Sequence, residues 1–256
     1  MKKPAGSSKG GAEMPISGHL QELRSRLIRS VLIISFAFGA AFYFSDSLLF
    51  FLKRPLHAEL VFFLAPAEAF WADLKVSLFV GFLAALPVIL YEIWQFVAPG
   101  LLPNERGYLF PFLIFATLLF FAGMAFCYLF ALPFALDFLI DYGRRSGITP
   151  QISVSMYIDF NLKFLLGFGL VFELPLVMLF LSRMGLLTPA FFRQNRKYAV
   201  LLAFLIAAIL TPTPDIFNQC IMAIPLIVLY EVGIIIVRIF GTKISLRKEE
   251  PGEMSP

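Results

Sequence analysis

The sequence predicts an all-α protein that crosses a membrane several times. Three observations point to this fold class: 59% of the residues are hydrophobic, the mean hydropathy is +0.84, and long apolar runs recur between short polar breaks. A soluble domain usually has roughly 45–50% apolar residues. Because one spanning helix needs about 20 apolar residues, a chain of 256 residues can hold about six spans with short loops.

The beginning of the chain divides into a tail and a helix. Residues 1–14 are rich in Gly, Ser and Lys and predict a flexible basic tail, whereas residues 17–26 predict an amphipathic helix at the membrane surface. On that helix the leucines fall on one stripe, and Glu22, Arg26 and Arg29 fall on a charged stripe beside it. The helix leads directly into the first apolar run.

We expect a membrane domain over residues 15–240, followed by a tail over 241–256. Its six spans cover about residues 27–44, 70–97, 108–140, 154–181, 198–210 and 216–240, with an external loop over 45–69. The third span is longer than a hydrocarbon core of roughly 30 Å, so it must tilt, kink near Pro133 or project beyond the bilayer. The fifth offers only about 20 Å of helix. The last two spans therefore form a hairpin too short for a normal bilayer, unless the bilayer thins around it.

The distribution of basic residues predicts the orientation. With the N-terminus inside and six spans, 15 of the 21 Lys and Arg residues fall in inside segments and four in outside segments. Since cytoplasmic loops carry an excess of Lys and Arg, both termini are expected in the cytoplasm.

Glu173 is the most informative polar residue within a predicted span. It lies near mid-depth, where a carboxylate costs roughly 2.5–3.5 kcal/mol on insertion scales. One interpretation is a protonated, hydrogen-bonded side chain that packs the bundle. The other is a polar spot offered to a substrate or to a helix of another subunit. Pro175, two positions on, removes a backbone donor and adds a local polar defect.

Other charged residues near the span ends have simpler interpretations. Asp159 and Lys163 stand four positions apart and predict an ion pair near the outer surface. Glu92 and Glu231 lie near the cytoplasmic ends of the second and last spans, where solvent can reach them.

Two acids on the predicted cytoplasmic face suggest a binding site. Glu22 lies in the amphipathic helix and Glu105 in the first cytoplasmic turn. Together they would suit a guanidinium-rich ligand, since arginine offers a rigid fork to carboxylates. The alternatives are an internal Glu22–Arg26 pair and an exposed turn at Glu105 and Arg106.

Nothing in the sequence supports an enzyme, a metal site or a bound cofactor. There is no Gly-x-x-x-x-Gly-Lys-Ser/Thr, His-Glu-x-x-His or Gly-x-Ser-x-Gly motif. The two histidines do not cluster with the two cysteines. Cys127 and Cys220 lie in apolar segments and are expected to be buried hydrophobes, not a disulfide.

Several motifs in order along residues 15–240 resemble the TatC family, the multi-spanning receptor of the twin-arginine protein translocase. They are His19–Arg26 (HLQELRSR), Pro87–Pro99 (PVILYEIWQFVAP) with Glu105-Arg106 beyond it, Phe172–Pro175 (FELP), and Thr211–Asp215 (TPTPD) with Gln219. The two tails lie outside the resemblance. Because the motifs are separate and occur in the family's order, the resemblance is specific.

The resemblance implies a cup-shaped bundle that binds the paired arginines of signal peptides on folded cargo. It implies that Glu22 and Glu105 contact those arginines, with Arg24 in the same motif. The intramembrane acid corresponds to Glu173, on the concave side of the bundle. Other positions that match family motifs are Pro55, Pro87, Phe96, Asp215 and Gln219.

The resemblance also implies partners and a location. The partners are the single-span proteins TatA and TatB, which pack near the last two spans, and further copies in a larger complex. The expected location is the bacterial cytoplasmic (inner) membrane, where the proton-motive force drives export without nucleotide. No nucleic acid is expected to bind.

Two other functions compete with a protein translocase subunit. A proton-coupled carrier of small molecules would use Glu173 as its titrating group. The sequence shows no internal repeat between its halves, which argues against a carrier. A purely structural scaffold would need no chemistry at Glu173.

Overall fold

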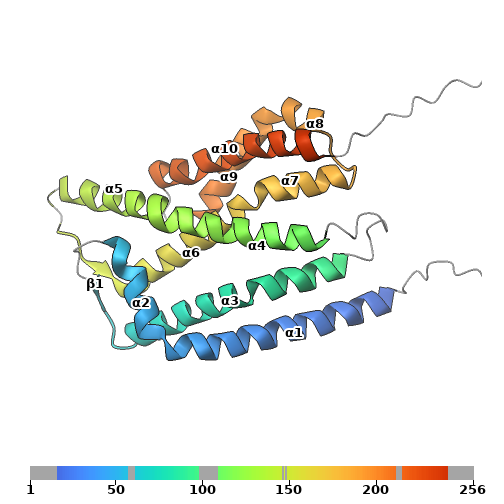
Figure 1. Ribbon diagram of the computed structural model, residues 1–256. Helices are drawn as coiled ribbons and strands as arrows, with labels where there is room; N and C mark the ends of the chain where they lie inside the picture. The colour runs from blue at the N-terminus through green and yellow to red at the C-terminus, as the bar shows by residue number, and fades with distance from the viewer. Residues whose placement is uncertain are drawn as a thin grey trace, which may run out of the picture.

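The computed structural model is a bundle of long helices with one pair of very short strands (Figure 1). It describes residues 16–56, 61–97, 109–145, 147, 149–211 and 215–241. The elements are α1 Ile16–Tyr43, α2 Ser45–Lys53, η1 Arg54–Leu56, β1 Val61–Phe62, α3 Glu68–Val97, α4 Leu109–Phe126, η4 Cys127–Ala131, α5 Leu132–Arg145, β2 Ile152–Ser153, α6 Val154–Phe172, α7 Leu174–Arg183, α8 Pro189–Gln194, α9 Arg196–Leu210 and α10 Ile216–Phe240. The tails 1–14 and 242–256 and the predicted site residue Glu105 lie outside the described residues.

The two ends of the bundle differ. The first residues of α1 and the last residues of α10 lie at the same end, which we call the tail end (Figure 1). The opposite end carries α2, β1 and the last turns of α5, and we call it the loop end. Because α3 runs antiparallel to α1, its last turns also reach the tail end.

α1 is one continuous helix that includes both the amphipathic segment 17–26 and most of the first predicted span. It packs along α3. Leu20, Leu23 and Leu27 are exposed on its outer side, whereas Arg26 reaches α3. Because lipid tails are as apolar as leucine, this outward stripe suits a bilayer. The charged stripe therefore faces the protein.

A glycine allows α1 and α3 to approach closely. A Cβ placed on Gly81 of α3 would lie 2.7 Å from the backbone nitrogen of Phe38 in α1. Small residues at such crossings let membrane helices pack backbone against backbone. From Arg26 to Phe38 is twelve positions, and from Glu92 back to Gly81 is eleven, so the two helices stay paired over a long stretch.

The predicted external loop 45–69 contains a helix that the sequence analysis did not anticipate. The C-terminal carbonyls of α2 accept hydrogen bonds from side chains far along the chain: Tyr128 donates to the Phe51 oxygen at 2.7 Å, beside the Arg54 backbone N–H, and Tyr157 donates to the Leu52 oxygen at 2.8 Å. Leu52 itself is buried. Since a helix end leaves carbonyls without partners, these tyrosines stabilise a helix whose sequence alone is too short to form one.

The short strands tie the two outer loops together. β1 pairs with β2 in parallel, with Val61 opposite Ile152 and Phe62 opposite Ser153. Glu68, at the start of α3, accepts hydrogen bonds from the Ser153 hydroxyl and, at 2.9 Å, from the Ser155 backbone N–H. The first turn of α3 is thereby fixed to the start of α6.

The long third span is continuous and has one irregular turn, just before Pro133. α4 passes through the π-helical segment η4 into α5, and the Leu132 N–H donates to the carbonyl of Cys127, five residues back. Proline has no N–H to donate, so the helix is irregular at the position where the sequence predicted a kink.

Cys127 is buried and Cys220 partly buried, and both are free thiols.

α6 and α7 form the central span, which is interrupted at Glu173. Half of the best spanning window in Val154–Arg183 is buried, the largest share of any candidate span among the described residues. Phe164 and Phe168 are fully buried in its core. α6 ends at Phe172 and α7 starts at Leu174, followed by the buried Pro175. The break therefore falls where the Glu-Leu-Pro sequence predicted a defect.

The predicted pairing of Asp159 with Lys163 is wrong. The carboxylate of Asp159 instead accepts from Lys75 of α3 at 2.7 Å, and Lys75 also donates to the Ser155 hydroxyl at 3.3 Å. An ion pair between two packed helices replaces a pair within one helix. α3 and α6 are in contact here, which places the lysine closer than the same-helix neighbour.

Five helices in the described part of the chain are long and apolar enough to cross a membrane, as is typical of a multi-pass membrane protein. α9, the fifth predicted span, has 15 residues, or about 22 Å of helix, against a core of roughly 30 Å. It packs against α10 as a hairpin.

Stacking of Phe217 on Phe138 brings the start of α10 to the middle of α5, so α5 projects further toward the loop end.

Candidate functional site

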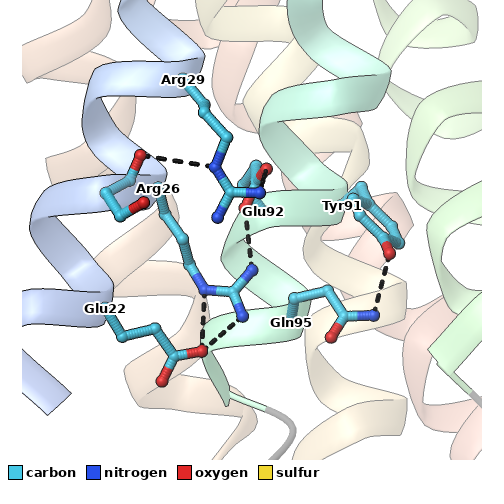
Figure 2. A network of polar contacts seen from close by, with 7 residues as sticks. Glu22, Arg26, Arg29, Tyr91, Glu92 and Gln95 are labelled. Atoms are coloured by element: carbon cyan, nitrogen blue, oxygen red, sulfur yellow. Dashed lines mark hydrogen bonds and ion pairs between the residues drawn. The ribbon is translucent and has the colours of Figure 1, made fainter. Parts of the chain in front are cut away.

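A polar seam joins α1 and α3 near the tail end. Glu22, Arg26 and Arg29 of α1 meet Glu92 of α3, and we call these four residues the α1–α3 seam (Figure 2). Beside them, the Gln95 side-chain amide donates to the Tyr91 hydroxyl at 3.2 Å.

Arg26 is the centre of the seam. Its Nε and Nη2 donate to Oε1 of Glu22 at 3.1 and 2.5 Å, and its Nη1 donates to Oε2 of Glu92 at 2.8 Å. Figure 2 shows its guanidinium lying between the two acids. The internal Glu22–Arg26 pair, which was the simpler interpretation of the sequence, is therefore present.

Glu92 overturns the expectation of a solvated acid. Its side chain is only 7% exposed, and it accepts from Arg26 and, at 3.1 Å, from Nη1 of Arg29. A buried carboxylate is tolerated when it is paired and hydrogen-bonded, and two guanidinium groups supply both here. The signal in the sequence that could have indicated this pairing is the presence of two arginines, Arg26 and Arg29, beside one acid on the charged stripe of α1.

The side chains of the seam become progressively less exposed from Arg29 to Glu92. The side chain of Arg29 is 53% exposed, Glu22 24%, Arg26 14% and Glu92 7%. Of the two acids, Glu22 is therefore the one whose side chain is more accessible to an approaching ligand. Glu92 lies behind Arg26.

The other predicted signal-peptide residues are not part of this seam. Arg24 is exposed, and it stands two positions from both Glu22 and Arg26, which places it on another side of α1. Glu105 lies outside the described residues, between the end of α3 and the start of α4. The structure therefore describes one of the two predicted surface acids.

Glu173 has the environment of a polar site inside the bundle. It is half-buried at the junction of α6 and α7, and its Oε1 is buried without a hydrogen-bond partner in the part of the chain that is described. Such an atom costs free energy unless something pairs with it.

Pro55, Pro87 and Phe96 occupy three levels of the bundle. Pro55 is buried in η1 and lines a cavity of about 810 Å³ between α2, α3 and α4 at the loop end. Pro87 lies inside α3, and Phe96 is partly buried in its last turn.

Asp215 and Gln219 organise the short hairpin. The Asp215 carboxylate caps α10 by accepting from the Asn218 backbone N–H at 2.7 Å and from its side-chain amide at 3.0 Å. Gln219 donates to the backbone carbonyl of Phe204 in α9 at 2.9 Å. Near the tail end, Arg196 of α9 pairs with Glu231 of α10 at 2.7 Å, so that acid is paired and partly exposed.

Comparison with known proteins identifies the family. Residues 18–225 match the model of the Sec-independent protein translocase protein TatC. The chain is 41% identical to the TatC protein of Desulforapulum autotrophicum, covering 94% of this chain and 90% of the relative. It is also 41% identical to the TatC protein of Aquifex aeolicus, covering 93% of this chain and 98% of the relative. The chain belongs to the TatC family.

A solved structure agrees with this assignment. A crystal structure described as the twin arginine translocase receptor TatC superposes with a TM-score of 0.76 at 41% identity, covering 86% of this chain and 98% of that one. As a family member the chain is a component of a protein translocase and not an enzyme. Protein transport is thereby favoured over the small-molecule carrier. Among the described residues, no three His, Cys, Asp or Glu side chains are grouped to hold a metal.

Proposed function

We propose that this chain is the core receptor subunit of a twin-arginine translocation system, and that Glu22 and Glu105 bind the paired arginines of signal peptides on folded proteins. The family assignment and the solved receptor at 41% identity support this proposal. The proposal also includes Arg24, which belongs to the same motif as Glu22 but is exposed on another side of α1.

The observation that carries the proposal is the contact between Glu22 and a guanidinium. Oε1 of Glu22 accepts two hydrogen bonds from Arg26, at a partly exposed position near the tail end. A carboxylate that holds one arginine has the chemistry to hold another, and because Oε2 of Glu22 is buried, an incoming arginine would take the place of Arg26 at Oε1. α3 ends and α4 begins at the same end of the bundle, and Glu105 belongs to the chain between them.

Glu173 supplies a second contact in this proposal. Its buried Oε1 without a partner is suited to accept a hydrogen bond from a polar group on a signal peptide or on a helix of another subunit. Glu173 lies at the junction between α6 and α7, and Pro175 beside it has no backbone N–H to donate.

The proposed partners are the single-span proteins TatA and TatB, at the α9–α10 hairpin. Leu201, Leu205 and Ile209 stand four positions apart on α9 and are all exposed, so they form one outward apolar stripe on the shortest span. Copies of the whole unit assemble into a larger complex. In this proposal residues 15–240 form six spans in the bacterial inner membrane, with both termini in the cytoplasm, and the proton-motive force drives export.

Crosslinking tests the receptor role. A signal peptide with a photoreactive residue beside its two arginines should crosslink to the wild-type protein in membranes, and Glu22→Gln or Glu105→Gln should abolish the product. Glu231→Gln is the matched control, because that acid also pairs with an arginine near the tail end but lies on α10. Undiminished crosslinking in both site variants would overturn the proposal.

Export tests the role of Glu173. Glu173→Gln keeps the size of the side chain but removes its charge and its acidic proton, and we expect reduced export of a folded reporter at normal protein level. Unchanged export would instead favour a packing role for Glu173.

A further inference from the structure

We propose that Arg26 is a built-in competitor for the signal-peptide arginines, and that Glu92 is a positioning residue that holds Arg26 when the peptide displaces it from Glu22. This inference rests on the proposed function of Glu22. It adds to that function a ligand-free state in which the receptor acid is already occupied by an arginine of its own chain.

The first support is that the two acids bind different nitrogen atoms of Arg26. Glu22 accepts from Nε and Nη2, whereas Glu92 accepts from Nη1. The guanidinium can therefore lose its contacts with Glu22 while it keeps the one with Glu92. Figure 2 shows the Arg26 guanidinium in contact with both acids.

The second support is the order of exposure. Glu22 is the more open acid, Arg26 lies deeper, and Glu92 is nearly covered. An arginine that arrives from outside meets Glu22 first and has to compete with Arg26 for it. Glu92 is less accessible to it, because Arg26 and Arg29 already pair with the two oxygens of that nearly buried carboxylate.

The third support is the charge balance before and after the exchange. In the ligand-free seam two acids face two arginines. When a peptide arginine takes Glu22, Arg26 keeps Glu92 as its partner, and Arg29, which is half exposed, can turn to solvent. No charge is left both buried and unpaired, so the large penalty for an isolated buried ion is avoided. Without Glu92, a displaced Arg26 would lose its last carboxylate.

The test measures binding of a fluorescent twin-arginine peptide to the full-length protein in lipid nanodiscs. A peptide with two lysines serves as the reference ligand. Arg26→Gln removes the competitor, and we expect it to tighten binding by about twofold to fivefold, as fits the loss of one partly exposed ion pair. Glu92→Gln should weaken binding by a similar factor, because Arg26 then has only Glu22 as a charged acceptor.

The double variant separates an effect through Arg26 from a direct effect of charge. If Glu92 acts by holding Arg26, then Glu92→Gln should change the affinity less than twofold in the Arg26→Gln background. Measurements at 0.15 M salt limit long-range effects of the lost charge. Arg196→Gln is the matched control, since it removes one arginine of an Arg–Glu pair near the tail end without touching the seam.

The outcomes are distinct. If the Arg26→Gln variant binds the twin-arginine peptide no more tightly than the wild-type protein does, the competitor role is overturned. If the Glu92→Gln variant binds the peptide as tightly as the wild-type protein, the positioning role is overturned. If Arg26→Gln does not fold, Arg26→Lys keeps the charge but lacks the fork and should still tighten binding. A purely structural seam would lower the melting temperature of the variants without raising affinity. Failure of the proposed function looks different: the wild-type protein would not prefer arginines over lysines, and Glu22→Gln would change nothing.

Discussion

Nη1 of Arg26 in α1 lies 2.8 Å from Oε2 of Glu92 in α3, across a sequence separation of 66 residues. The contact joins the first helix to the end of the third at the level of the proposed receptor acid. It exists only because α1 and α3 pack closely along their length, and that packing depends on a glycine further along the pair.

The first prediction concerns this close approach. Gly81→Ala should lower the stability of the protein by about 1–3 kcal/mol, because the new methyl group would collide with the backbone of α1 at Phe38. Thermal unfolding of the detergent-solubilised protein, followed by tryptophan fluorescence, measures the change. The variant should also weaken binding of the twin-arginine peptide, since the α1–α3 seam lies on the same helix pair.

Gly39 is the matched control for Gly81. It lies on α1, and a Cβ at Gly39 would meet nothing within 4 Å. Alanine is the better helix former, so Gly39→Ala should keep or slightly raise the melting temperature. Equal losses at both glycines would show that the crossing at Gly81 is not a tight contact.

The second prediction concerns the ion pair between α3 and α6. Lys75→Glu places a carboxylate against Asp159 and should destabilise the protein by roughly 1 kcal/mol, because both side chains are partly exposed. The exchange Lys75→Glu with Asp159→Lys should recover most of the loss. Lys163→Gln serves as the control and should leave the melting temperature unchanged. A loss with Lys163→Gln as large as with Lys75→Gln would instead support pairing within α6.

The third prediction concerns the link between the outer loops. Glu68→Ala removes the acceptor for the Ser153 hydroxyl and for the Ser155 and Leu64 backbone N–H groups. Hydrogen exchange should therefore become faster in residues 61–65 and 152–156, while α1 and the end of α3 stay protected. Asp141→Ala, at an exposed ion pair near the loop end, should not change exchange in these segments. Unchanged exchange with Glu68→Ala would show that the paired strands hold the loops without it.

Much of the fold could be predicted from the sequence, because apolar length and helix-breaking residues act locally. The long apolar runs predicted the long helices close to their observed bounds, and the Glu173-Leu174-Pro175 sequence located the break between α6 and α7. Pro133 located the irregular turn of the third span. The short helix α2 was missed, since its stabilising hydrogen bonds come from tyrosines far along the chain.

Part of the candidate site could be predicted in the same way. The helical period placed Glu22 and Arg26 on one stripe of α1 and gave the internal pair as one of two interpretations. The position of Glu92 behind Arg26 was not predicted, and neither was the pairing of Lys75 with Asp159.

By itself the sequence determined which long segments are helices, where they break and which side chains share a face, since each of these depends on residues within a few turns. Only the tertiary structure decided which face meets which neighbour. Arg26 and Asp159 each had a candidate partner four positions away, and each has a partner on another helix: Arg26 gains Glu92 as a second acceptor, and Asp159 pairs with Lys75 in place of Lys163. The physical reason is that helix periodicity orients a side chain around its own axis, whereas ion-pair partners across the bundle are set by packing between segments more than 60 residues apart.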